Sequence, residues 1–415
     1  MMCRSSAVLL LLACMCGLIT SKKLDRSEHV SQLSEANNRF CIKLYKTLIE
    51  NEEDPMKNMM FSPLSISAAM AMTHLGAKGD TAKQIDDTFM FSKIEDKKFH
   101  SAFGELHSLL FEKVSDNVTL KSSNRVFANN KLPVLEDYKN ALTVYGAKVE
   151  KVDFGGNARE LINKWANEST EGKIPSLLGE DDVNAGTALL IANTVFFKGD
   201  WHSMFREYQT ENRDFYVTHY KVVRTPFMFQ KGQFRFGYVE ELTLQIVEID
   251  YAGKEFSMFV LLPENFDLVS VEKELNHENL TRWLSNLKYK TVDLTLPKFK
   301  IEETLYLHQI LPKMGVTDVF STNKSDLSGI ASQTPGLFVD QVIHKAVIEV
   351  HEKGSVAAAA TTVRVVARSI GNHLSFTADH PFIWGIRHVG SGHLLFVGRL
   401  KRPDGPVLLA ERDEL

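Results

Sequence analysis

One stretch near the carboxyl end limits the folds open to this chain: residues 352–369, Glu-Lys-Gly-Ser-Val-Ala-Ala-Ala-Ala-Thr-Thr-Val-Arg-Val-Val-Ala-Arg-Ser. At a period of two, one face carries no charge and consists of Ser355, Ala357, Ala359, Thr361, Val363 and Val365. The opposite face carries one charge and consists of Val356, Ala358, Ala360, Thr362, Arg364 and Val366. Extended at about 3.3 Å per residue, residues 352–368 would span roughly 55 Å. Such a stretch suits the middle of a β-sheet, where small side chains limit the cost of parting two strands.

The same stretch has a second interpretation. Four successive alanines, residues 357–360, are strong helix formers, and a short surface helix would explain them equally well. These residues alone leave both structures open.

The bulk composition is that of a globular protein with a large core. Of 415 residues, 44% are hydrophobic and 24% are charged, and the net charge of −4 gives no indication of binding to nucleic acid or anionic membranes. Phosphate-binding glycine loops, His-Glu-x-x-His, Gly-x-Ser-x-Gly and Cys/His metal spacings are all absent from the sequence. We therefore expect no enzymatic activity, cofactor or metal, although a hydrolase without a recognisable motif stays open. His344, His380, Trp201 and Trp384 stand in apolar surroundings that favour packing roles.

The amino-terminal residues are typical of a secretory signal peptide. Arg4 precedes an apolar run over residues 7–19, and small residues follow, so we expect cleavage near Ser21. An uncleaved anchor is the alternative. The mature chain, residues 22–415, would form a single domain that keeps one cysteine, Cys41, and so no internal disulfide. No later stretch is long and apolar enough to span a bilayer.

Two further features concern the secretory pathway. The chain ends in Arg412-Asp413-Glu414-Leu415, which closely resembles the address that returns proteins to the endoplasmic reticulum. We therefore expect a retrieval receptor as a partner and residence in the endoplasmic reticulum, with secretion also open. Four Asn-x-Ser/Thr sequons permit N-glycosylation, at Asn117, Asn167, Asn279 and Asn323.

Hydrophobic periodicity predicts an α+β fold, with helices early and strands dominating later. Helices are expected over residues 24–50, 63–72 (with Ser62 as a cap, and Gly76 and Gly79 as its end), 96–113, 135–145, 157–170 and 305–314. Strands are expected at 118–127, 188–197, 292–299 and 338–349, as several short strands within 222–263, and as at least two within 374–399. No change in composition marks a linker.

Several motifs together resemble the serpins, a family of single-domain proteins with about three β-sheets and eight or nine helices, most of them inhibitors of serine proteases. The matching segments run over most of the mature chain, at residues 61–65, 193–201, 296–299, 311–316, 344–346 and 379–382. Their number, order and spacing make the resemblance specific.

The resemblance implies a function for the stretch described first. Residues 352–374 would be the exposed reactive-centre loop, with a hinge made of Glu352, Gly354, Ser355, Ala357, Ala358, Ala359 and Ala360. The reactive bond of inhibitory members follows the seventeenth loop residue, which here gives Arg368–Ser369. Val356 stands where many inhibitors carry an acidic residue. Since its side chain would face solvent after insertion, we do not expect it to block insertion.

Other positions resemble the family's structural clusters. Ser62, Asn193 and His344 resemble the polar shutter cluster beneath two strands that part, and Trp201 resembles the tryptophan of the breach at their top. We expect the shutter residues to hold the sheet closed by hydrogen bonds.

The implied partner is a serine protease, captured by a monomer in a covalent 1:1 complex. Arg368 favours trypsin-like enzymes, whose carboxylate pockets pair with guanidinium. Furin-like proprotein convertases are a second possibility, although Val365 stands where they usually prefer a basic residue. A non-inhibitory chaperone of the endoplasmic reticulum is a third, and the alanine-rich hinge argues against it. Activation by heparin is not indicated.

Overall fold

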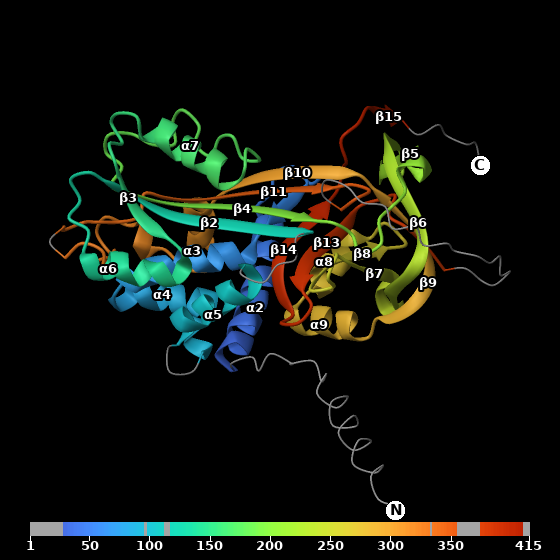
Figure 1. Ribbon diagram of the computed structural model, residues 1–415, viewed down its shortest axis with the longest axis horizontal. Helices are drawn as coiled ribbons and strands as arrows, with labels where there is room; N and C mark the ends of the chain where they lie inside the picture. The colour runs from blue at the N-terminus through green and yellow to red at the C-terminus, as the bar shows by residue number, and fades with distance from the viewer. Residues whose placement is uncertain (1–27, 95–97, 112–116, 333, 355–373, 410–415) are drawn as a thin grey trace, which may run out of the picture.

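The computed structural model describes residues 28–94, 98–111, 117–332, 334–354 and 374–409 (Figure 1). The expected signal peptide, the loop from Ser355 through Arg368–Ser369, and the terminal Arg412-Asp413-Glu414-Leu415 lie outside these residues and stay predictions. Among the described residues, no helix is both long and apolar enough to cross a membrane.

The described residues contain nine α-helices. They are α2 (Glu28–Glu50), α3 (Pro63–Gly76), α4 (Gly79–Phe89), α5 (Phe99–Phe111), α6 (Glu136–Ala141), α7 (Ala158–Ser169), α8 (Leu268–Glu274), α9 (His277–Ser285) and α10 (Leu307–Ile310). Figure 1 shows α7 above a sheet of long strands and α3 to α6 below it. The sheet is therefore covered on both faces.

The sheet between these helices is the smaller of two and has five strands. In spatial order they are β10 (Phe299–Tyr306), β11 (Gln341–Val350), β4 (Leu189–Gly199), β2 (Val118–Asn129) and β3 (Lys148–Val152). β11 and β4 run parallel, with Gln341 opposite Leu190 and Val347 opposite Phe196. β10 is antiparallel to β11 and β2 is antiparallel to β4, whereas β3 runs parallel to β2. Ten of the eleven residues of β4 are buried, which explains the unbroken apolar run of its sequence.

The larger sheet has ten strands. Its main path is β1 (Met59–Phe61), β14 (His393–Leu400), β13 (Phe382–His388), β8 (Phe256–Pro263), β7 (Leu244–Asp250), β6 (Lys221–Val239), β9 (Lys288–Pro297) and β12 (Leu374–Thr377). β5 (Glu211–Thr218) and β15 (Val407–Leu409) also pair with β6. The start of β6 pairs with β5 and its end pairs with β7, so this one strand joins two parts of the sheet.

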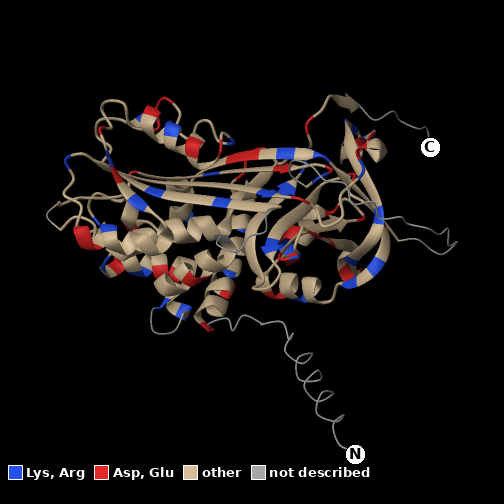
Figure 2. Ribbon diagram, in the orientation of Figure 1, with Lys and Arg blue, Asp and Glu red and all other residues tan. Residues whose placement is uncertain are grey.

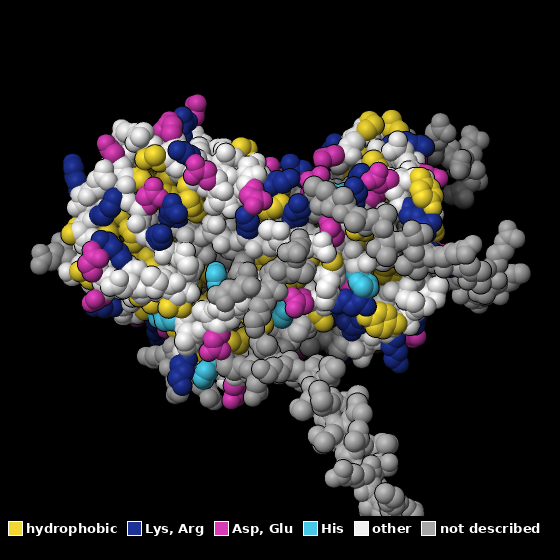
Figure 3. Space-filling view, viewed as in Figure 1, with side chains coloured by type: hydrophobic (Ala, Val, Ile, Leu, Met, Phe, Trp, Pro, Cys, Tyr) yellow, Lys and Arg dark blue, Asp and Glu magenta, His cyan; other side chains and the backbone are white. Residues whose placement is uncertain are grey.

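The packing divides into two apolar clusters. The larger cluster contains residues from Val30 to Leu400 and includes residues of every described α-helix except α7. The smaller packs α7 onto the other face of the five-stranded sheet, through Ile162 and Trp165 against Leu190 and Ile343. On the face shown in Figures 2 and 3, acidic and basic side chains of the described residues are interspersed.

The α+β class predicted from the order of elements is confirmed, but several elements differ from the prediction, and the helices α8 and α9 were not expected. Gly76 ends α3, but Gly79 begins α4, a helix that the sequence analysis did not anticipate. The segment expected to hold only short strands contains β6, which is 19 residues long. Leu305 and Tyr306, expected to begin a helix, end β10 instead, because their backbones pair with His344 and Ile343 of β11.

Candidate functional site

A tight turn follows β11 where the chain leaves the five-stranded sheet. Gly354 donates its N–H to the carbonyl of His351 at 3.0 Å, and the two residues form an antiparallel bridge. We call residues His351 to Gly354 the hinge turn. The bridge sets Gly354 antiparallel to His351 just beyond the end of β11.

Trp201, just beyond the end of β4, holds the hinge turn in place. Its backbone N–H donates to the carbonyl of Lys353 and its indole Nε1 donates to the carbonyl of His351, both at 2.9 Å. The buried indole stacks on Tyr251 with ring centroids 4.5 Å apart. The turn is thus docked on a rigid aromatic support.

Glu352 fixes the turn through its side chain. The carboxylate pairs with Nζ of Lys298 at 2.9 Å and accepts a hydrogen bond from Oγ1 of Thr210 at 2.8 Å. Only 7% of the residue is exposed. Burial works to raise the pKa of the carboxyl, but the hydrogen bonds from Lys298, its own backbone and Thr210 outweigh that effect, and the pKa lies below its ordinary value.

Gly354 is required at its position for two reasons. Its φ of +98° lies in the region that glycine alone adopts without strain. A Cβ atom there would also collide with the carbonyl oxygen of Gly199. The glycine of the hinge therefore permits both the bend and the close contact with the end of β4.

A row of polar side chains crosses the parallel pair lower in the sheet. His344 of β11 lies opposite Asn193 of β4, which lies opposite Asn124 of β2. Residues paired in this way have side chains on the same face. His344 Nδ1 contacts Asn193 Oδ1, and Asn193 Nδ2 donates to Asn124 Oδ1 at 2.6 Å. The row links three strands at the centre of the sheet.

Ser62 completes the row from below. Its backbone N–H donates to His344 Nε2 at 3.1 Å, so Nδ1 carries the imidazole proton and donates to Asn193. Ser62 is also the N-cap of α3, and its Oγ accepts from the N–H of Ser65. His344 is fully buried, and burial lowers the pKa of the imidazole to about 3. The neutral ring thus bridges β11, β4 and α3.

Comparison with known proteins identifies this arrangement. The family model described as Serpin (serine protease inhibitor) matches residues 35–403. Leukocyte elastase inhibitor of Homo sapiens is 38% identical over 385 residues, which cover 90% of this chain and all of that protein. Antithrombin-III of Homo sapiens is 38% identical over 387 residues, which cover 91% of this chain and 83% of that protein.

The chain belongs to the serpin family. A crystal structure of uncleaved ovalbumin covers 90% of this serpin and all of its own chain, with a TM-score of 0.82 and 31% identity. The fold predicted from the resemblance is therefore confirmed, and the larger sheet accounts for two of the three expected sheets through its two parts. The family is described as one of serine protease inhibitors, so its membership indicates inhibition of serine proteases rather than catalysis.

The structure brings together the residues expected to form the shutter and the breach of this serpin. Ser62 and Asn193 both contact His344, and Trp201 contacts the hinge turn. His380 is also buried, with Nδ1 on Asp379 and Nε2 on the carbonyl of Pro263, as expected of a packed histidine.

The four sequons differ in their surroundings. Asn117, Asn167 and Asn323 are exposed, whereas Asn279 is half-buried. The amide of Asn279 donates to the carbonyl of Glu274 at 2.8 Å, and its oxygen accepts from Arg282 at 3.1 Å. A glycan on Asn279 would have to accommodate these contacts, so the other three are the less constrained acceptors.

Three residues of this site were missed in the sequence. Asn124 extends the polar row, and Lys298 and Thr210 hold Glu352. Each contacts a partner that is far away in the sequence. Asn124 and Thr210 belong to no local motif, and the motif at 296–299 that contains Lys298 does not reveal its pairing with Glu352. Their roles follow only from the pairing of the strands.

Replacing Gly354 with alanine should undock the hinge turn, because the new Cβ collides with Gly199 and the positive φ becomes strained. The Trp201 amide would lose its acceptor, and its hydrogen exchange should accelerate at least tenfold. Gly336→Ala is the matched control, since Gly336 also has positive φ but its Cβ would meet no closer atom than Thr322 O at 3.4 Å. Equal exchange in both variants would contradict this account.

The buried His344 should make stability depend on pH. An unfolded histidine titrates near pH 6.5, whereas burial lowers the pKa of His344 to about 3. Below pH 6.5 the unfolded chain gains a proton that the native imidazole does not, so unfolding becomes easier by up to about 1.4 kcal/mol per pH unit. Stability should therefore be greatest above pH 6.5 and decline as pH falls toward 3.

Thermal unfolding between pH 7.5 and pH 5 tests this expectation. His344→Gln should be less stable than the natural chain at pH 7.5 but should lose less of its melting temperature on acidification. His219→Gln, at an exposed histidine, should retain the natural pH dependence. Identical slopes for all three proteins would rule out His344 as the source.

Proposed function

We propose that this serpin inhibits trypsin-like serine proteases as a suicide substrate, with Arg368–Ser369 as the reactive bond. One observation carries the proposal: β11 and β4 lie side by side and parallel, and the hinge turn at the end of β11 pairs Gly354 antiparallel with His351. A strand that returned from the hinge turn between them would be antiparallel to both neighbours. Antiparallel pairs are slightly more stable per residue than parallel ones.

The mechanism follows from that geometry. The protease serine attacks the carbonyl of Arg368, the peptide bond to Ser369 breaks, and residue 369 leaves as a free amine. The severed loop then inserts between β4 and β11, and each new ladder hydrogen bond contributes about 1 kcal/mol net. The tethered protease is dragged across the molecule, and its catalytic site is distorted before the acyl bond is hydrolysed.

The hinge turn and the polar row would control the rate of insertion. Insertion must separate His344 from Asn193 and must release Trp201 from the carbonyl of Lys353. Both contacts lie along the seam between β11 and β4, so they keep the sheet closed until the loop is cut. Strain release of this kind is a recognised switching mode.

Arg368 selects the target in this proposal. Its guanidinium would pair bidentately with the carboxylate of a trypsin-like primary pocket. The terminal Arg412-Asp413-Glu414-Leu415 supports a second candidate, inhibition of furin-like convertases in the secretory pathway, since a retrieval receptor would keep the protein in that compartment. Val365 argues against it.

Mixing this serpin with trypsin should give a covalent 1:1 complex that survives heat and detergent, with cleavage after Arg368 by mass spectrometry. Arg368→Ala should abolish the complex, and Arg364→Ala, at the other arginine of the loop, should leave it intact. Ser355→Arg should be cleaved without forming a complex, because a buried arginine slows insertion. Clean cleavage of the natural chain would favour the non-inhibitory chaperone.

The retrieval proposal has a separate test in secreting cells. Deleting the last four residues should raise the fraction of protein in the medium severalfold, because a receptor that reads this address could no longer return it. Replacing them with Lys-Asp-Glu-Leu should lower that fraction. Equal secretion of all three proteins would show that the terminus is not read.

A further inference from the structure

A short strand near the carboxyl end lies outside the part of the chain that the family model describes. The match to the serpin family ends at residue 403, and β15 (Val407–Leu409) follows it. β15 pairs antiparallel with the start of β6, with Val407 opposite Val223 and Leu409 opposite Lys221 (Figure 1). We call residues 404–409 the terminal strap. Nothing in the proposed inhibition mechanism uses the terminal strap.

The chain is anchored just before the terminal strap. Asn58 Nδ2 donates to the carbonyl of Arg402 at 2.6 Å, and Asn58 Oδ1 accepts from the N–H groups of Lys401 and Arg402 at 2.8 Å and 3.0 Å. Pro403 is buried. Residues up to Pro403 therefore belong to the folded domain, and the terminal strap is the first part of the terminus that could detach without disturbing it.

Gly405 lets the terminal strap turn onto β6. Its φ of +148° lies in the region that favours glycine. A Cβ atom there would stand 2.6 Å from the carbonyl oxygen of Arg224 and 2.8 Å from a methyl group of Val223. Docking of the terminal strap on β6 therefore depends on this glycine.

The docked strap is held by little apolar burial. β15 is three residues long, and Val407 and Leu408 are each 46% exposed. Of the residues that the structure describes, those of the terminal strap belong to neither apolar cluster. Segments with few buried apolar contacts and exposed backbone hydrogen bonds are the first to open locally. The terminal strap can therefore detach from β6 while the rest of the domain stays folded.

Docking sets how far the terminal address can reach from the domain. While β15 is paired, only Ala410 and Glu411 lie between it and Arg412-Asp413-Glu414-Leu415, a spacer of about 7 Å at full extension. With the terminal strap detached, residues 404–411 form the spacer, which reaches about 28 Å. A receptor that reads the last four residues has to enclose them. The short spacer would bring the folded domain against the receptor, whereas the long one would keep the two apart.

We propose that the terminal strap regulates retrieval: paired with β6 it withholds Arg412-Asp413-Glu414-Leu415 from the retrieval receptor, and detached it presents them. This inference rests on the retrieval function proposed above and adds the control of that function. The apparent affinity of the receptor then scales with the fraction of molecules whose strap is detached. One docking equilibrium would thus set the division between residence in the endoplasmic reticulum and secretion.

A disulfide that locks the terminal strap tests the docked state. Leu408 lies opposite Val222, and residues opposite one another in an antiparallel pair have Cα atoms about 4.5–5.5 Å apart, a distance that suits a disulfide. Val222→Cys/Leu408→Cys should therefore be secreted from cells as fully as the protein that lacks the last four residues. Cys41 is buried and does not compete for the new thiols. Val222→Ser/Leu408→Ser is the matched control, because it changes the same positions without a covalent lock.

Gly405→Ala tests the detached state without a change in the core. The new Cβ collides with Arg224, so the N–H groups of residues 407–409 should exchange faster and the secreted fraction should fall severalfold. Asp404→Ala, at the exposed neighbouring position, should alter neither quantity. All these variants should keep the melting temperature of the natural chain to within a few degrees, which separates detachment of the strap from unfolding of the domain.

Two outcomes separate this inference from the retrieval proposal. If deletion of the last four residues leaves secretion unchanged, the address is not read, and both proposals fail. If the deletion raises secretion but the locked and the natural proteins are secreted equally, the address is read whatever the state of the terminal strap. In that case only the present inference is overturned.

Discussion

The pairing of β4 with β11 is the constraint on which the rest of the structure depends. Two parallel strands at the centre of a five-stranded sheet are covered by α7 on one face and by α3 to α6 on the other (Figure 1). Nothing covalent joins them, and their contact combines a backbone ladder with the His344–Asn193 hydrogen bond. In the proposed mechanism the sheet must be stable yet able to part. One buried neutral imidazole that links both strands to a helix cap suits that requirement.

In the proposed mechanism, the hinge turn has to meet two opposing requirements. It must stay docked before cleavage, and the contacts with Trp201, Lys298 and Thr210 satisfy that requirement. It must also be released, and the nature of those contacts allows it. The Lys298 side chain is 36% exposed, so water can replace its contact with Glu352 at modest cost. The two bonds from Trp201 go to backbone carbonyls, which an inserted strand could satisfy in other ways.

Local sequence signals were sufficient to predict individual strands, helix caps and turns. They were not sufficient to predict which residues lie next to one another in the folded chain. The apolar run of β4, the cap at Ser62 and the glycine of the hinge each have a cause within a few residues, so they could be predicted. Asn124 could not, because its role depends on a strand partner about 70 positions away. Gly79 was misjudged for a related reason: glycine is common where helices end, but here its positive φ lets the chain turn directly into α4.

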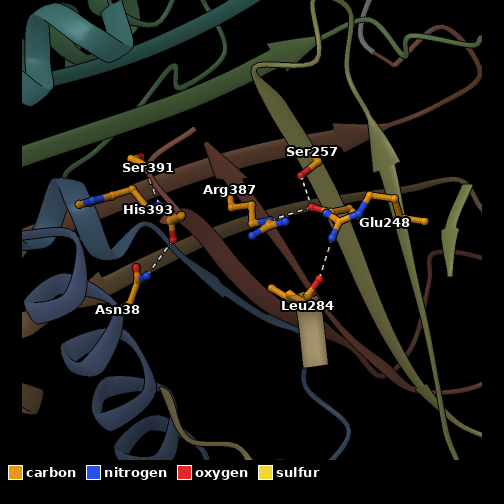
Figure 4. Close-up of polar contacts among 9 residues, drawn as sticks. Asn38, Glu248, Ser257, Leu284, Arg387, Ser391 and His393 are labelled. Carbon is orange, nitrogen blue, oxygen red and sulfur yellow. Dashed lines mark hydrogen bonds and ion pairs between the residues drawn. The ribbon is translucent and has the colours of Figure 1, made fainter. Parts of the chain in front are cut away.

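The larger sheet has a buried group of charges of its own. In Figure 4, Arg387 of β13 reaches the buried carboxylate of Glu248 on β7, and Arg235 of β6 pairs with the same carboxylate. Buried ion pairs often contribute less to stability than apolar side chains of the same volume would. These three strands are joined in one ladder that does not open in the proposed insertion. Different strands therefore build the part of the molecule that would stay fixed and the pair, β4 and β11, that would separate.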